Sequence, residues 1–88
     1  MVGIGITISS MTIAECSDFE AKLAADKMAQ GYINGKTFKP ALILKKHLPS
    51  KRKEVASYVK TDDLYYTVFS LVNSKCSAKI IKRTNGKR

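Results

Sequence analysis

The chain has 88 residues, of which 44% are hydrophobic, so it is long enough for one small domain with a compact core and is not typical of a disordered segment. Sixteen Lys or Arg residues against seven Asp or Glu residues give a net charge of +9, which favours an anionic partner. No stretch approaches 18 consecutive apolar residues, so we expect no membrane span.

The first segment alternates apolar side chains with small ones. Val2, Ile4, Ile6 and Ile8 alternate with glycine, threonine and serine, a period of two that predicts a half-buried strand over 2–9. The stretch MVGIGITISSMTIA is also apolar enough to resemble the hydrophobic region of a signal peptide, but it lacks the basic residues that precede one. We therefore expect a cytoplasmic protein, of a cell or of an infected host.

The second segment predicts an amphipathic helix. Ser17 and Glu20 have the spacing of a capping box, and Gly31 or the Asn34-Gly35 pair ends the periodic pattern. A start near Met11 fits the same periodicity, so the sequence leaves two starts open. The face expected to be buried consists of Ala21, Ala24, Ala25, Met28, Ala29 and Tyr32. Phe19 and Leu23 fall on the polar side, where we expect them to cover a sheet edge or a loop.

The remaining chain has the alternation and turn chemistry of strands. Strand patterns occupy 38–45, 55–60, 64–72 and 76–81, and 64–72 is apolar on both faces, as in a central strand. The predicted class is α+β: one N-terminal strand, one amphipathic helix, then an antiparallel meander of three to four strands with the helix on one face. We expect one domain over 1–83 and a basic tail over 84–88 that frays.

The two cysteines, Cys16 and Cys76, allow at most one disulfide. Small secreted domains usually carry four or more, so we expect both thiols to be reduced and partly buried. The single histidine and the absence of CxxC or HxxxH spacing predict no metal site, and no motif indicates a cofactor.

The basic residues are concentrated in the second part of the chain. Residues 1–35 hold two bases and four acids, whereas 36–88 hold fourteen bases and three acids. The loop over 45–53 and the segment over 79–88 carry ten of these fourteen bases, which predicts contacts to phosphates, with a merely solvated loop as the alternative. The candidate nucleic-acid-binding residues are Lys45, Lys46, Lys51, Arg52, Lys53, Tyr58, Lys60, Lys79, Lys82 and Arg83.

Aromatic residues lie between these basic stretches. Alternation places Tyr65 and Phe69 on one face of their strand and Tyr66 on the other, so one set is expected in the core. An exposed tyrosine beside lysines is typical of single-strand binding. In the last strand, the same alternation predicts that Lys79 and Arg83 share a face and that Lys82 lies opposite.

The first functional hypothesis is a small basic module that binds nucleic acid through its phosphates, with weak sequence preference. The second is a phage- or plasmid-type protein that binds and inhibits an acidic host protein. The third is a small basic ribonuclease with His47 as its only conventional general base. Size, charge and element order are similar to those of RelE-like toxin ribonucleases, but none of their motif residues stands at matching spacing. Apolar strand edges also predict a homodimer.

Overall fold

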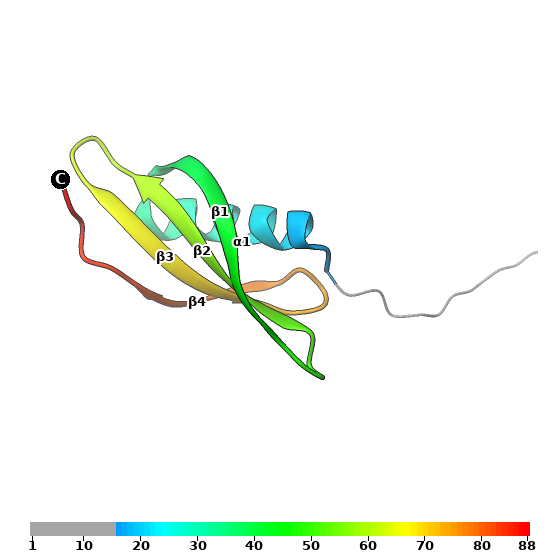
Figure 1. Cartoon of the computed structure of the whole chain (residues 1–88). Coiled ribbons are helices and arrows are strands. Elements are labelled where there is room, and N and C mark those ends of the chain that lie inside the picture. The colour runs from blue at the N-terminus through cyan, green and yellow to red at the C-terminus, as the bar shows by residue number, and fades with distance from the viewer. Residues whose placement is uncertain (1–15) are drawn as a thin grey trace, which may run out of the picture.

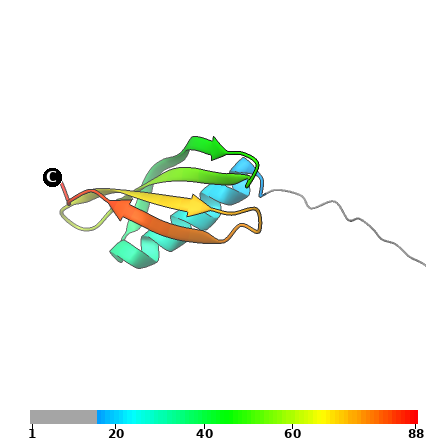
Figure 2. The same ribbon diagram turned by 90° about the horizontal axis from the view of Figure 1, so that it is seen from below.

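The computed structural model describes residues 16–88, which form one helix and a four-stranded antiparallel sheet. The sheet order is β1-β2-β3-β4, and the helix lies along one face while the other face is uncovered by any described element (Figure 1 and Figure 2). The predicted α+β class is therefore confirmed, and the strand expected over 2–9 lies outside the described residues. The elements are α1 Asp18–Ile33, β1 Lys36–His47, β2 Arg52–Lys60, β3 Tyr65–Val72 and β4 Ala78–Arg83.

Capping sets both ends of α1. The Ser17 hydroxyl accepts from the backbone N–H of Glu20 at 3.0 Å, which confirms the N-cap half of the predicted capping box, and it donates to the Glu20 carboxylate at 3.2 Å. Of the two starts that the sequence left open, the helix takes the one at Asp18. Asn34 ends it in the left-handed conformation, and its backbone N–H donates to the carbonyl of Gln30.

The buried stripe of α1 is narrower than the pattern predicted. Ala21, Ala25 and Ala29 are fully buried, whereas Met28 and Tyr32 are exposed, so their assignment to the core was wrong. These three alanines stand four residues apart and form the fully buried line of the helix, with Ala24 and Ile33 partly buried beside it. Phe19 and Leu23 are 70% and 54% exposed, so both leave much of their side chain uncovered.

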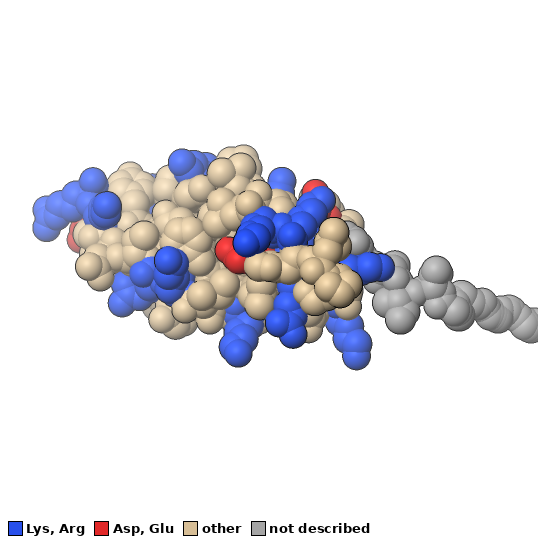
Figure 3. Space-filling model, turned by 60° about the horizontal axis from the view of Figure 1, so that its bottom comes forward, with Lys and Arg blue, Asp and Glu red and all other residues tan. Residues whose placement is uncertain are grey.

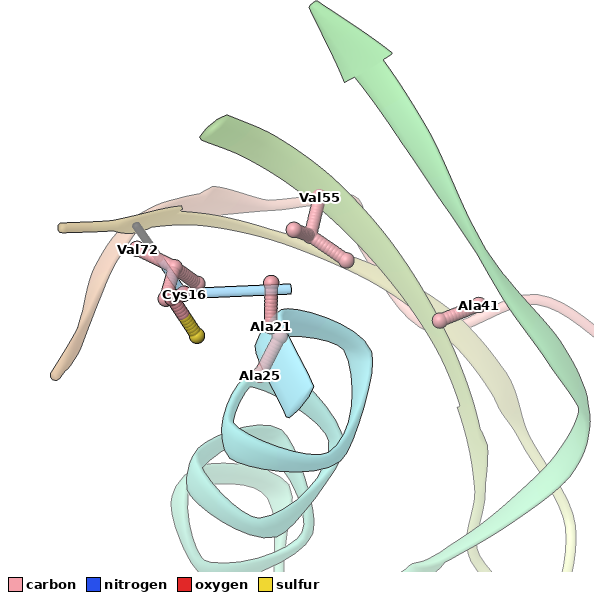
Figure 4. Close-up of a cluster of buried hydrophobic side chains, with 6 residues drawn as sticks. All are labelled: Cys16, Ala21, Ala25, Ala41, Val55 and Val72. Atoms are coloured by element: carbon pink, nitrogen blue, oxygen red, sulfur yellow. The ribbon is translucent and has the colours of Figure 1, made fainter. Parts of the chain in front are cut away.

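Small side chains bring the helix close to the sheet. Ala21 and Ala25 point at Val55, Val72 and Ala41 of the strands (Figure 4). A second cluster joins Ala29 to Val59 and Val68. This core contains few large side chains, so the domain gains little stability from apolar burial and depends on other contacts.

A disulfide joins Cys16 to Cys76 across 60 residues of sequence. The expectation of two reduced thiols was therefore wrong. The start of α1 and the turn between β3 and β4 lie at the same end of the sheet, which brings the two Cα atoms to 5.1 Å. Since the core is small, this cross-link supplies a constraint that packing alone does not.

The C-terminal tail follows β3 instead of fraying. The backbone N–H of Thr84 donates to Thr67 O at 2.9 Å, and that of Lys87 donates to Tyr65 O at 2.9 Å. Tyr65 in turn donates its own N–H to Lys87 O. The prediction of a frayed tail was wrong, because the single bridge between Tyr65 and Lys87 leaves no alternation pattern in the sequence.

No helix in the described part of the chain is both long and apolar enough to cross a membrane.

Candidate nucleic-acid interface

The sheet presents two faces of different chemistry. Toward α1 it presents the buried valines and serines of β2 and β3. The other side, here called the open face, carries on β2 and β3 the side chains of Arg52, Glu54, Ala56, Tyr58, Lys60, Tyr65, Thr67, Phe69 and Leu71. Directly opposed residues share a face in an antiparallel pair, so the register fixes this assignment.

Three rings gather at the end of the open face nearest the β2–β3 turn. Phe38 packs edge-on against Tyr65, with centroids 5.0 Å apart, and against Tyr58 at 6.4 Å. We call Phe38, Tyr58 and Tyr65 the aromatic cluster. Phe38 is 40% exposed and Tyr65 is 44% exposed, so two of the three rings present much of their surface to solvent.

A lysine ammonium lies over each of three aromatic rings on the open face. The ammonium of Lys39 lies 4.4 Å from the centroid of Tyr58, and that of Lys60 lies 6.0 Å from Tyr65. Further along the sheet, the Lys82 ammonium lies 5.3 Å from Phe69. A cation over a ring face is held by the quadrupole of the ring, so these lysines are kept close to the aromatic surface.

The opposite end of the open face, next to the β1–β2 hairpin, is polar. His47 Nε2 lies 2.7 Å from Glu54 Oε2, and Lys45 stands opposite Glu54 in the register. Arg52 stands opposite His47 and lines a shallow pocket of about 280 Å³ together with Lys79 and Leu71. We call Lys45, Arg52 and Lys79 the hairpin-end cations.

Acidic residues are nearly absent from this side of the described chain. Glu54 is the one acid on the open face of residues 16–88, and it is paired with His47. The other described acids lie on α1 or in the β2–β3 turn: Asp18, Glu20, Asp26, Asp62 and Asp63. Figure 3 shows groups of Lys and Arg side chains over the visible surface with few acidic atoms among them. Among the described residues, the open face therefore carries a clear excess of positive charge.

Seven of the ten predicted binding residues lie where one ligand could reach them. Six are on the open face, and Lys51 is exposed in the hairpin turn, where it has a positive φ of 63°. The six are Lys45, Arg52, Tyr58, Lys60, Lys79 and Lys82.

Two predicted residues serve the helix instead. Lys53 is 2% exposed and donates to the carbonyl of Cys16 and, at 2.8 Å, to Asp18 Oδ1. Lys46, on the same side, forms an ion pair with Asp18 at 3.3 Å. Both residues lie on the helix-facing side of the sheet, because β2 turns Lys53 toward α1 and its basic neighbour Arg52 away from it, and Lys46 stands opposite Lys53.

Arg83 is the third predicted residue that leaves the open face. It stands opposite the buried Val68, and its guanidinium lies 5.5 Å from the ring of Tyr66. A register shift in the pairing of β3 with β4 reverses the alternation there. Lys82, and not Arg83, therefore shares the open face with Lys79.

The sequence analysis missed four basic or aromatic residues of this surface. Lys36, Phe38 and Lys39 belong to the aromatic end although they precede Pro40, and Lys87 reaches Tyr65 through the tail. The neighbouring Phe-Lys pair at the start of a strand was the available signal. The position of Lys87 had none, because it depends on one isolated backbone bridge.

Two carboxyl groups near the helix have shifted pKa values in opposite directions. Hydrogen bonding from Lys53, with help from Lys46, lowers the pKa of Asp18 below its ordinary value. Burial against the sheet raises the pKa of Asp26. Its Oδ1 has no hydrogen-bond partner among the described residues. The nearby Ser57 hydroxyl lowers the pKa of Asp26, but by less than burial raises it.

Cys16, Glu20 and Cys76 bring three atoms of metal-binding type within 4.8 Å of one another. Both sulfur atoms are joined in the disulfide, and a metal binds thiolates rather than a disulfide. This cluster therefore offers no thiolate ligand in the oxidised protein.

No protein-family model, curated protein or solved structure matches the chain. Functional inference therefore depends on the surface just described.

Proposed function

We propose that this chain is a small nucleic-acid-binding module that contacts the phosphate backbone with its open face and has weak sequence preference. The observation that carries the proposal is the composition of that face. Eight basic residues lie on it, and the single acid among the described residues there is paired with His47. The eight are Lys36, Lys39, Lys45, Arg52, Lys60, Lys79, Lys82 and Lys87.

Such a surface binds phosphates through the release of condensed counterions, so affinity should depend steeply on salt. If four or five phosphates are neutralised, affinity falls on the order of 100-fold between 50 and 200 mM salt. The test is a fluorescence titration of labelled single-stranded DNA, RNA and duplex DNA at both salt concentrations. Absence of binding to all three at 50 mM salt would overturn the proposal.

A matched pair of double variants locates the interface. Arg52→Ala with Lys79→Ala removes two charges from the open face and should weaken binding at least 10-fold. Lys22→Ala with Lys27→Ala removes two charges from α1 and should change the affinity much less. An equal loss in both variants would mean that net charge matters and the open face does not.

The disulfide bears on where the protein works. Disulfides persist in oxidising compartments and are rare in the cytosol, so Cys16–Cys76 is an argument against the cytoplasmic prediction. A thiol-trapping experiment on the protein in its native host would decide the compartment. Full modification of both cysteines without prior reduction would favour the cytoplasm.

A protein partner is the second candidate, and the outer side of α1 is the observation that favours it. Phe19 and Leu23 stand one helical turn apart and are both more than half exposed. An acidic host protein, as in the phage or plasmid hypothesis, would instead meet the basic open face. Binding of a protein through Phe19 and Leu23 should survive a rise in salt that abolishes nucleic-acid binding.

The His47–Glu54 pair gives the ribonuclease hypothesis little support. The two side chains are hydrogen-bonded to each other and form one acid–base unit. The pocket beside them is otherwise lined by Ser50, Arg52, Leu71 and Ile81, and none of these is a histidine or carboxylate that could serve as the second acid or base of a ribonuclease. RNA cleavage by the purified protein that is lost in His47→Ala, with RNA binding retained, would establish the activity.

A further inference from the structure

We infer that the aromatic cluster stacks unpaired bases, which makes single-stranded nucleic acid the preferred ligand. The inference depends on the proposed function, because it names the form of nucleic acid that the open face takes. It is carried by the coincidence of exposed rings and cations at one end of that face.

The rings are arranged as a platform and not as a core. Phe38, Tyr58 and Tyr65 meet edge to face, with interplanar angles near 70°, so they offer ring faces in more than one direction. They surround a shallow hollow of about 200 Å³, with Lys39 and Lys87 also in its lining. A flat base can lie against such a surface, and the sequence tolerance of stacking agrees with weak sequence preference.

The backbone holds this platform rigidly. Tyr58 lies two residues before the end of β2 and is flanked by a strand on each side, with Lys39 of β1 on one side and Thr67 of β3 on the other. Tyr65 exchanges two backbone hydrogen bonds with Lys87. Rings that are fixed before binding lose little conformational entropy when a base stacks on them.

The cations decide the chemistry of the ligand. Lys39 and Lys60 lie within 6.0 Å of ring centroids, so anything that covers the rings also meets two ammonium groups. An apolar protein surface would strip water from these charges without replacing it. A nucleotide satisfies both groups, since its base covers a ring and its phosphate pairs with the ammonium.

Further cations continue the site along the open face, from the aromatic cluster toward the β1–β2 hairpin. On β2, Tyr58 and Arg52 are six residues apart, which is about 20 Å of strand. Lys82, over Phe69, lies on the same face between the aromatic cluster and the hairpin-end cations. A single strand whose bases stack at the cluster could therefore continue toward Arg52 with its phosphates on lysines. In a duplex the base faces are already stacked on one another and are not available to the rings.

The experiment compares three ligands of equal phosphate number: labelled oligo-thymidine, an abasic strand and a duplex. The abasic strand reports phosphate binding alone. Oligo-thymidine should bind at least about 5-fold more tightly than the abasic strand, the lower end of the effect of one stacked base. The sequence has no tryptophan and four tyrosines, two of them in the aromatic cluster, so quenching of tyrosine fluorescence by oligo-thymidine should be weaker in Tyr65→Phe than in the parent.

Ring-deletion variants test the assignment. Phe38→Leu and Tyr65→Leu keep an apolar side chain but remove the ring, and each should abolish the preference for oligo-thymidine without affecting the abasic strand. Tyr65→Phe should retain it, and Phe19→Leu on α1 is the control for ring loss elsewhere. Thermal melts establish that each variant is folded.

The outcomes separate the two proposals. Equal, salt-sensitive binding of oligo-thymidine and the abasic strand would overturn base stacking and leave phosphate binding intact. Tighter binding of the duplex would also overturn the preference for single strands. Failure of all three ligands to bind at 50 mM salt would overturn both proposals.

Discussion

Lys53 is the only charged side chain among the buried residues of the described chain, and its ammonium joins three parts of the structure. It extends from β2, donates to the carbonyl of Cys16 and pairs with Asp18 in the first turn of α1. Acceptors on two residues compensate for the removal of its charge from water. The helix start is thus attached to the sheet by a polar contact beside the disulfide.

Replacement of Lys53 should change the stability of the domain without changing its affinity for nucleic acid. Lys53→Met should lower the free energy of unfolding by about 1–3 kcal/mol, because the carbonyl of Cys16 is left without this donor. Denaturant titration measures the change. Under conditions where the variant is folded, its affinity for nucleic acid should stay close to that of the parent. A large loss of affinity with unchanged stability would contradict the placement of Lys53.

The two shifted carboxyl groups predict opposite responses to pH. The depressed pKa of Asp18 adds stability above the ordinary Asp value of about 3.9, and this is lost as pH falls through the lower folded value. Asp18→Asn should therefore lower Tm at pH 7. The raised pKa of Asp26 works in the other direction, because stability is lost as pH rises through it. Asp26→Asn should raise Tm by a few degrees at pH 7, and the gain should vanish below about pH 4.

At the scale of elements, the connection between α1 and β1 packs so closely on β2 that it leaves no space for a side chain at Gly35. A Cβ atom on Gly35 would lie 2.4 Å from the backbone carbonyl oxygen of Lys60, a contact that flexible side chains cannot relieve. Glycine is therefore required there because the helix end passes directly over the end of β2. Gly31, within α1, has nothing within 4 Å of the same added atom.

These two glycines predict opposite effects of the same substitution. Gly35→Ala should destabilise the domain by about 1–3 kcal/mol, because the β2 backbone must shift. Gly31→Ala should stabilise it by about 0.5–1 kcal/mol, because alanine costs less backbone entropy in a helix. Parallel thermal and denaturant unfolding of the two variants checks both. Equal effects would show that the α1–β1 connection is less tightly packed than described.

The elements themselves could be predicted because their signals are local. A capping box predicted the start of α1, and alternation and turn residues predicted the four strands. The buried stripe of α1 and the face of Arg83 could not be predicted in the same way. One depends on how much of the helix a small sheet can contact, and the other on a register shift that leaves no mark in the alternation.

The sequence predicted which residue types make up the candidate site better than it predicted which individual residues lie in it. Arg52 and Lys53 are adjacent basic residues, and only the pairing of β2 shows that the first faces out and the second faces α1. Phe38 and Lys87 reach the site through tertiary pairing. The disulfide was missed because counting cysteines indicates a compartment but does not show which chain ends meet.

At the scale of the whole molecule, the disulfide closes most of the described chain into one loop. In the chain-entropy account, a loop of 60 residues restricts the unfolded state by about 4 kcal/mol. Replacement of both cysteines by serine should therefore lower stability by about 2–4 kcal/mol, measured by denaturant unfolding. A reducing agent should destabilise the parent by a similar amount and leave the serine variant unchanged. Equal stability of the parent with and without reductant would contradict the cross-link.

The two edges of the sheet bear on the predicted homodimer. β1 and β4 each have a neighbouring strand on one side only. Edge strands pair readily with a second copy unless charges oppose it, and both strands here carry several lysines. Homodimerisation stays a prediction, and light scattering with and without oligo-thymidine tests whether a polyanion changes the oligomeric state.

The disulfide also decides what a protease can release. The β1–β2 hairpin is the most open target for trypsin, since Lys51 and Arg52 are exposed and the neighbouring Leu48 is 80% exposed. A cut there falls between Cys16 and Cys76, so the two pieces stay covalently joined as well as paired through the sheet. A nicked molecule would migrate as one band without reductant and as two with it. Cleavage and reduction together, and neither one alone, would be needed to separate the helix and β1 from the rest of the domain.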